Sequence, residues 1–154
     1  MKRIQDIFAV RVLLEAEAAR LAAGRVDAEQ LRNLDALCSA GYDPDDPESV
    51  AHFLTLNREI HVAVARASGN ERLASTLSQL LDDMERIFHF ALKLRDQSLQ
   101  IRHEHRTMVD ALVLGEGVKA AEIVAEQVLA GQRMVTAALQ ATPQLMSVSL
   151  EVPA

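Results

Sequence analysis

The segment from Pro47 to Asn70 constrains the fold of this chain more than any other, because its apolar residues follow the spacing of a helix. They recur every three or four positions, at Val50, Phe53, Leu54, Ile60, Val64 and Ala67. This spacing places them on one face of a single amphipathic helix. Asn57 and His61 fall on the same face, four residues apart and therefore side by side. Because an unpaired polar group in a core costs roughly 1–3 kcal/mol, this pair must find partners.

The rest of the chain extends the helical pattern. The 154 residues are 49% hydrophobic and include only six glycines and four prolines, which favours helix. The other predicted helices cover about 3–23, the stretch between a cap at Asp27 and a break at Gly41, 71–95, 98–114 and 118–140. Asp46 is predicted to cap the helix that begins at Pro47. We therefore expect one all-α domain over residues 1–141, an antiparallel bundle of about six helices with a central ligand cavity, and a flexible tail over 142–154.

Composition excludes several classes of protein. No apolar run approaches the roughly 18 residues that a membrane span requires, and charges interrupt the start, MKRIQDIFAV, as they would not in a signal peptide. The lone cysteine, Cys38, falls on an apolar helix face, which predicts an inert core thiol and a cytoplasmic protein. A net charge of −6 argues against nucleic-acid binding by this chain alone. No phosphate loop, nucleophile elbow or HExxH helix is found, so the chain is not expected to be an enzyme.

Two charged residues interrupt the apolar face of the first predicted helix. Arg11 and Glu15 lie four apart on the inner face of the first helix, together with Phe8 and Ala18. The commoner role of such a pair is a structural ion pair at a helix seam. The alternative is a pocket arginine, held by the glutamate, that offers its planar guanidinium to a ligand carboxylate.

His105 points inward from the fifth predicted helix, and Gln127 is the inward polar residue of the sixth. Together with Asn57 and His61, these residues come from three helices that an antiparallel bundle would pack around one space. The sequence therefore predicts that the four polar side chains meet in a shared internal pocket.

Four motifs resemble a known family. They are VRVLLEAEAARLAAGR, NREIHVAVARASGN, HEHRTMVDALVLGEG and AAEIVAEQVLAG, which follow one another between about residues 4 and 140. The chain is similar to the FCD domain, the C-terminal effector-binding domain of FadR-type regulators in the GntR family. That resemblance implies an antiparallel helical bundle with a central cavity, which binds a small organic acid and, in many members, a divalent metal held by one aspartate and three histidines.

Carried onto this sequence, the aspartate position falls on Asn57 and the first histidine on His61. The second histidine is His105, and the third position falls on Gln127. Two of the four metal ligands are therefore replaced by neutral amides, which bind a transition metal more weakly. His61, His105 and Asn57 remain as ligands for a zinc or nickel ion. The alternatives are a metal-free cavity in which these residues and Arg11 bind the acid directly, and a vestigial site.

The resemblance implies a ligand-sensing, dimerising regulatory domain of a bacterial GntR/FadR-type transcriptional regulator. Its partners would be a small organic acid and a second copy of the chain, with no membrane contact. DNA would be bound only through a winged-helix domain that is absent from this chain, so the chain is either an excised domain or a stand-alone sensor. The alternatives are a helical dimerisation module with a vestigial pocket and a metal-dependent enzyme built on His61 and His105. The enzyme ranks lower because Glu15 is the only acidic residue on the inner helix faces.

Overall fold

The computed structural model describes residues 2–94 and 98–141, which form six α-helices and no strand. The helices are α1 (Lys2–Ala22), α2 (Ala28–Cys38), α3 (Pro47–Ala67), α4 (Glu71–Leu94), α5 (Ser98–Val113) and α6 (Gly117–Ala141). The all-α bundle predicted from the sequence is thus confirmed, and the helix ends differ from the predicted ones by a few residues. The predicted break at Asp96–Ser98 falls largely, and the tail 142–154 wholly, outside the described residues.

Local sequence sets the helix starts and turns. The Asp27 side chain accepts a hydrogen bond from the Gln30 amide at 3.0 Å. Asp46 likewise accepts from the Glu48 amide, with Pro47 at the first helical position. Gly24 ends α1 with a φ of 75°, a conformation that glycine adopts without steric cost. Its amide donates to the Leu112 carbonyl at 2.8 Å, which fixes the end of α1 against the end of α5.

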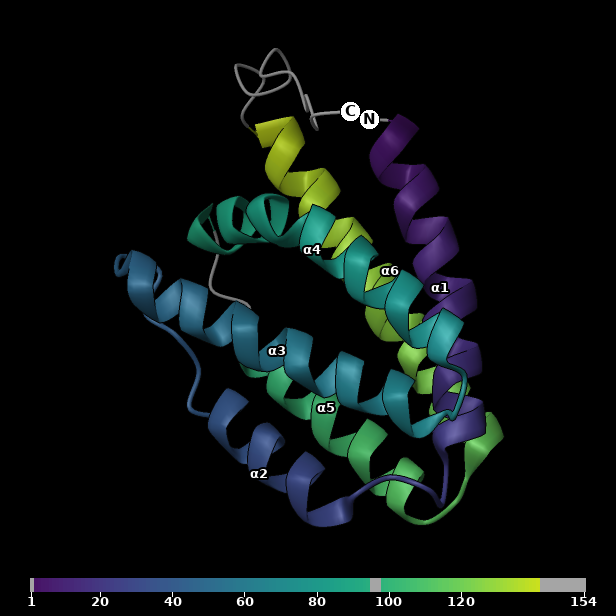
Figure 1. Cartoon of the computed structure of the whole chain (residues 1–154). Coiled ribbons are helices and arrows are strands. Elements are labelled where there is room, and N and C mark those ends of the chain that lie inside the picture. Colours follow the sequence, from purple (N-terminus) through teal and green to yellow (C-terminus); the bar gives the residue numbers. More distant parts are fainter. Residues whose placement is uncertain (1, 95–97, 142–154) are drawn as a thin grey trace.

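Helix α3 runs through the centre of the described bundle (Figure 1). It packs against α1, α2 and α4, so residues outside its predicted apolar face are also buried. These additional buried residues are Leu56, Val62 and Ala65. The sequence predicted a single buried face for this helix, and the structure corrects that to burial on several sides because helices cover it from more than one direction.

Helix α1 packs antiparallel against α6. The backbone carbonyl of Arg20 lies beside Gly117 near one end of the pair, and Phe8 lies beside Gly131 further along. Helix α1 also contacts α3 and α4, and it runs along an outer edge of the molecule (Figure 1). Within the part of the chain that the structure describes, no helix combines the length and the apolar character needed to cross a bilayer.

Candidate ligand-binding site

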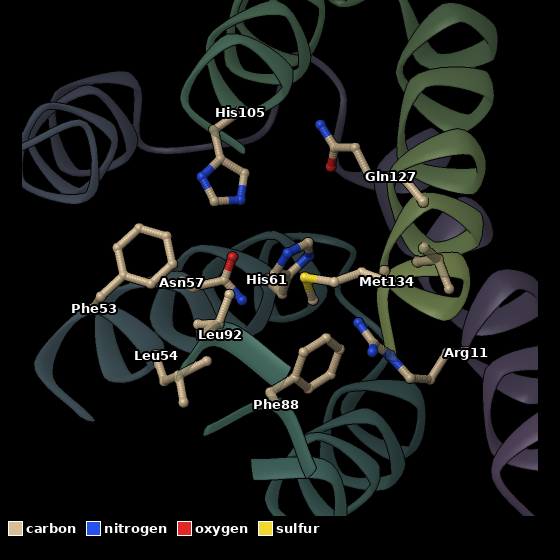
Figure 2. Close-up of a pocket in the computed structure, with 13 residues that line it drawn as sticks. Arg11, Phe53, Leu54, Asn57, His61, Phe88, Leu92, His105, Gln127 and Met134 are labelled. Carbon is tan, nitrogen blue, oxygen red and sulfur yellow. The ribbon is translucent and has the colours of Figure 1, made fainter. Parts of the chain in front are cut away.

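One cavity of about 80 Å³ lies between α1, α3, α4, α5 and α6. All five residues predicted for the site line it: Arg11, Asn57, His61, His105 and Gln127. Figure 2 shows these side chains extending from four different helices toward the same space. The remaining wall is mostly apolar and consists of Phe53, Leu54, Phe88, Leu92, Val128, Ala130, Gly131 and Met134. The geometry therefore brings together the polar residues that the sequence placed on separate helices.

A buried carboxylate connects two of the cavity's helices. One oxygen of Glu15 accepts a hydrogen bond from Nε of Arg11 at 2.7 Å, within α1. The other oxygen lies 2.9 Å from Nδ1 of His61 on α3. This is hydrogen-bonding distance, although the angle at the N–H is not ideal. Since an ionised carboxylate only accepts, the proton of this contact belongs to Nδ1 of His61. The outer nitrogen of the ring, Nε2, is then left for other partners.

Opposing effects set the charge of Glu15. Burial alone would raise its pKa, but the positive charges of Arg11 and His61 and the hydrogen bonds from both residues lower it to about 2. Glu15 is therefore ionised at neutral pH. Arg11 and Glu15 form the buried ion pair that the sequence suggested, and Arg11 also lines the cavity.

Two phenylalanine rings hold the guanidinium group of Arg11. Its central carbon lies 5.2 Å from the centroid of Phe8 and 5.4 Å from that of Phe88, at cation–π distance from both. The rings themselves meet edge to face, with centroids 6.0 Å apart. Arg11 is only 4% exposed, and its Nη1 has no hydrogen-bond partner among the described residues. A buried donor of a charged group is thus held at the cavity wall, ready for an acceptor.

The two histidines face each other across the cavity wall. Their ring centroids are 5.6 Å apart with the planes inclined at 70°. Burial, together with the charge of His61, lowers the pKa of His105 to about 3, although Glu15 acts in the opposite direction. His105 is therefore neutral near pH 7. Its Nδ1 is buried and has no hydrogen-bond partner in the described part of the chain.

The donor atoms around the cavity form a weak set for a metal. Across residues 2–94 and 98–141, no group of three or more His, Cys, Asp or Glu side chains is placed to hold a metal ion. The cavity offers two imidazoles and the amides of Asn57 and Gln127. Glu15 is the nearest carboxylate to His61, but Arg11 and His61 already engage both of its oxygens.

Sequence reasoning missed two features of the site. It paired Glu15 with Arg11 but did not find the contact between Glu15 and His61. It also treated Phe8 and Phe88 as core residues only, although they position the arginine. The signal for Phe8 was present, because residues three apart on a helix lie on the same side.

The comparison with protein families agrees with this geometry. A family model for the FCD domain matches residues 6–130, which is most of the chain and includes the five polar residues that line the cavity. No curated protein matches the chain. The chain belongs to the FCD family, the effector-binding domains of GntR-type transcription regulators.

Proposed function

We propose that this domain senses a small organic acid, which Arg11 and the polar cavity residues bind directly, and that it dimerises as the regulatory part of a bacterial transcription regulator. One observation supports the binding of an acid. Nη1 of Arg11 is buried, Arg11 lines the cavity, and this nitrogen has no acceptor among the described residues. Leaving a buried donor unpaired costs roughly 1–3 kcal/mol, and more when the group is charged. A carboxylate would satisfy it with a charge-assisted hydrogen bond.

The size and lining of the cavity favour short acids. Its volume of about 80 Å³ is several times the roughly 10–15 Å³ that one buried water needs, so the cavity has room for a few water molecules or a small acid. Acids of two to four carbons, such as acetate, lactate or malonate, are of this order of size. A neutral imidazole at His105 offers one donor and one acceptor, and the amides of Asn57 and Gln127 offer both kinds. These groups suit hydroxyl or oxo substituents on the acid, while Phe53 and Leu92 can cover its carbon atoms.

A tightly bound metal does not fit this donor set. Transition-metal sites in proteins usually take three or four strong ligands, and this cavity supplies two imidazoles and two neutral amides. We therefore propose binding without a metal. Coordination by His61, His105 and Asn57 is the alternative, and metal analysis of gently purified protein tests it.

The state of Glu15, the one buried carboxylate among the described residues, disfavours an enzymatic role. With its pKa lowered to about 2, Glu15 is a weak base near pH 7, and its oxygens contact Arg11 and His61. An efficient general base has a pKa close to the working pH. A sensing role needs instead a ligand whose affinity differs between two conformations of the domain. The cavity meets this need if closing around the acid shifts α1 relative to α3 and α6.

The test is calorimetric titration of the purified chain with acetate, lactate, pyruvate and malonate, each paired with the neutral amide of the same size. We expect at least one acid to bind and its amide to bind much more weakly. Arg11→Lys keeps a positive charge near Glu15 but loses the planar guanidinium, and should weaken binding by roughly tenfold or more. Arg66→Lys, on the exposed side of α3, is the matched control.

Each titration is repeated with EDTA and with added zinc. Binding that persists in EDTA supports direct recognition by the protein, whereas binding that requires zinc supports the metal-dependent alternative. If no acid binds under either condition, the proposal fails and a structural module with a vestigial pocket is the better description.

A further inference from the structure

Gly131 is the one glycine of this chain that the backbone does not require; all six glycines lie among the described residues. At Gly117 an added Cβ would lie 2.8 Å from the carbonyl oxygen of Arg20, too close for a side chain. Gly131 has no positive φ, and an added Cβ would meet its nearest neighbours at 3.6–3.7 Å, an ordinary contact. The remaining four have a φ of 75° or 81°, which favours glycine: Gly24, Gly41, Gly69 and Gly115.

Glycine at this position weakens the helix that contains it. Gly131 lies in the interior of α6, where glycine is less favourable than alanine because it loses more conformational freedom on folding. Alanine would fit there without displacing a neighbour. Gly131 also lines the cavity, so a methyl group at this position would take up cavity space. What the glycine provides is therefore room inside the cavity.

The space beside Gly131 lies at the arginine end of the cavity. The atoms nearest to an added Cβ are Cε1 and Cζ of Phe88 and Cε1 of Phe8. These two rings are the ones that hold the guanidinium group of Arg11. An acid whose carboxylate meets the unpartnered Nη1 of Arg11 would therefore place the carbon next to that carboxylate close to Gly131.

We propose that Gly131 determines specificity by leaving room for a methyl group on the carbon next to the carboxylate of the ligand. The inference rests on the proposed function and adds the class of acid. The surroundings suit a methyl group, because the ring edges of Phe8 and Phe88 offer no hydrogen-bonding atom. Met134, about one turn further along α6, also extends into the cavity (Figure 2). One methyl group in an apolar pocket changes affinity by roughly 10–200-fold.

Two pairs of acids that differ by one methyl group test this specificity: acetate with propionate, and glycolate with lactate. In calorimetric titrations the parent protein should bind the larger acid of each pair about tenfold more tightly. In Gly131→Ala the alanine methyl group fills the space, so propionate and lactate should lose this advantage while acetate and glycolate bind with little change. The ratio of dissociation constants within each pair is the quantity to compare, because a general loss of affinity cancels in it.

Gly117→Ala is the matched control, because it adds the same methyl group to the same helix outside the cavity lining. Its Cβ would press on the carbonyl of Arg20, so the midpoint of urea unfolding should fall, yet the ratio within each pair of acids should stay at the value of the parent. Gly131→Ala should instead raise the urea midpoint, since alanine favours the helix and meets no clash there.

The outcomes separate the role of Gly131 from ligand sensing. A parent protein that binds acids without preferring the larger one, or ratios that are the same in Gly131→Ala as in the parent, overturn the role of Gly131 and leave the sensing function standing. A lower urea midpoint in Gly131→Ala would show that the fold itself needs the glycine, which also overturns the inference. If neither these acids nor pyruvate and malonate bind the parent, the proposed function fails and the specificity fails with it.

Discussion

Nδ1 of His61 lies 2.9 Å from Oε2 of Glu15, so a buried carboxylate on α1 contacts the histidine that borders the cavity on α3. The other oxygen of Glu15 accepts from Arg11. Two cavity-lining residues on different helices, Arg11 and His61, are thereby linked through one negative charge, so a change at one should alter the position of the other. This relationship makes Glu15 the residue whose loss is most informative.

Glu15→Gln should destabilise the fold strongly. The substitution keeps the volume of the side chain but leaves the buried guanidinium of Arg11 without its counter-charge, a change that typically costs about 3–5 kcal/mol. Urea unfolding at pH 7 measures the loss as a shift in midpoint at constant slope. Glu17→Gln is the matched control, because Glu17 also pairs with an arginine on α1 but does so in solvent. Exposed pairs contribute little. Similar midpoint shifts for the two variants would contradict the role given to the buried carboxylate.

Stability should fall as the pH drops below about 6.5, and His105 is the reason. Its folded-state pKa of about 3 lies below the ordinary value of 6.5, so between these values the unfolded chain binds a proton that the folded chain does not. Stability then decreases with falling pH by up to ~1.4 kcal/mol per unit from this residue. Glu15 adds a second loss below pH 4.5, because its folded pKa of about 2 means that only the unfolded chain is protonated there.

Urea midpoints at half-unit steps from pH 7.5 to 4 measure this dependence. His105→Gln should flatten the curve between about pH 6.5 and 5, whatever its effect on absolute stability. His52→Gln replaces an exposed histidine on α3 and serves as the control, with the slope of the parent protein expected. An unchanged slope in His105→Gln would show that other groups cause the acid sensitivity.

The helices could be predicted from the sequence because the caps, turns and apolar spacing that define them act over only a few residues. Asp27, Asp46 and Gly24 are caps and a turn whose chemistry acts within a few residues, and each is found in its predicted role. The three-and-four spacing of apolar residues also predicted the inward face of α3, although the structure buries this helix on further sides. Such signals do not depend on how the helices are placed relative to one another.

The contacts within the site depend on that placement. Periodicity shows that Arg11, His61 and His105 face inward, but it gives neither the height at which each helix stands nor the tilt between them. The 2.9 Å contact between Glu15 and His61 and the placement of Arg11 between two phenylalanine rings require both quantities. The sequence could therefore predict the membership of the cavity lining better than the pairings inside it.

Restoring the replaced ligands should create a metal site where the parent protein lacks a good one. In Asn57→Asp/Gln127→His, the cavity would hold a carboxylate and three imidazoles, a set that suits zinc or nickel. Binding to the folded state alone stabilises it by about 2.7 kcal/mol when the free metal is at a hundred times its dissociation constant. Thermal unfolding with zinc, with nickel and with EDTA measures this gain, which should be much larger in the double variant than in the parent.

The control for this experiment introduces the same residues outside the cavity. Asn33→Asp/Gln140→His alters two exposed positions on α2 and α6, so any weak binding of metal to surface groups should appear there too. Without metal the double variant of the cavity should be less stable than the parent, because the new carboxylate lies in a cavity whose wall is mostly apolar. Added metal should reverse that loss of stability. A double variant that is less stable without metal and more stable with it would show that the four side chains converge on one metal ion. A parent protein that gains as much stability from zinc as the double variant would show that Asn57 and Gln127 already suffice, and it would overturn direct, metal-free recognition of the acid.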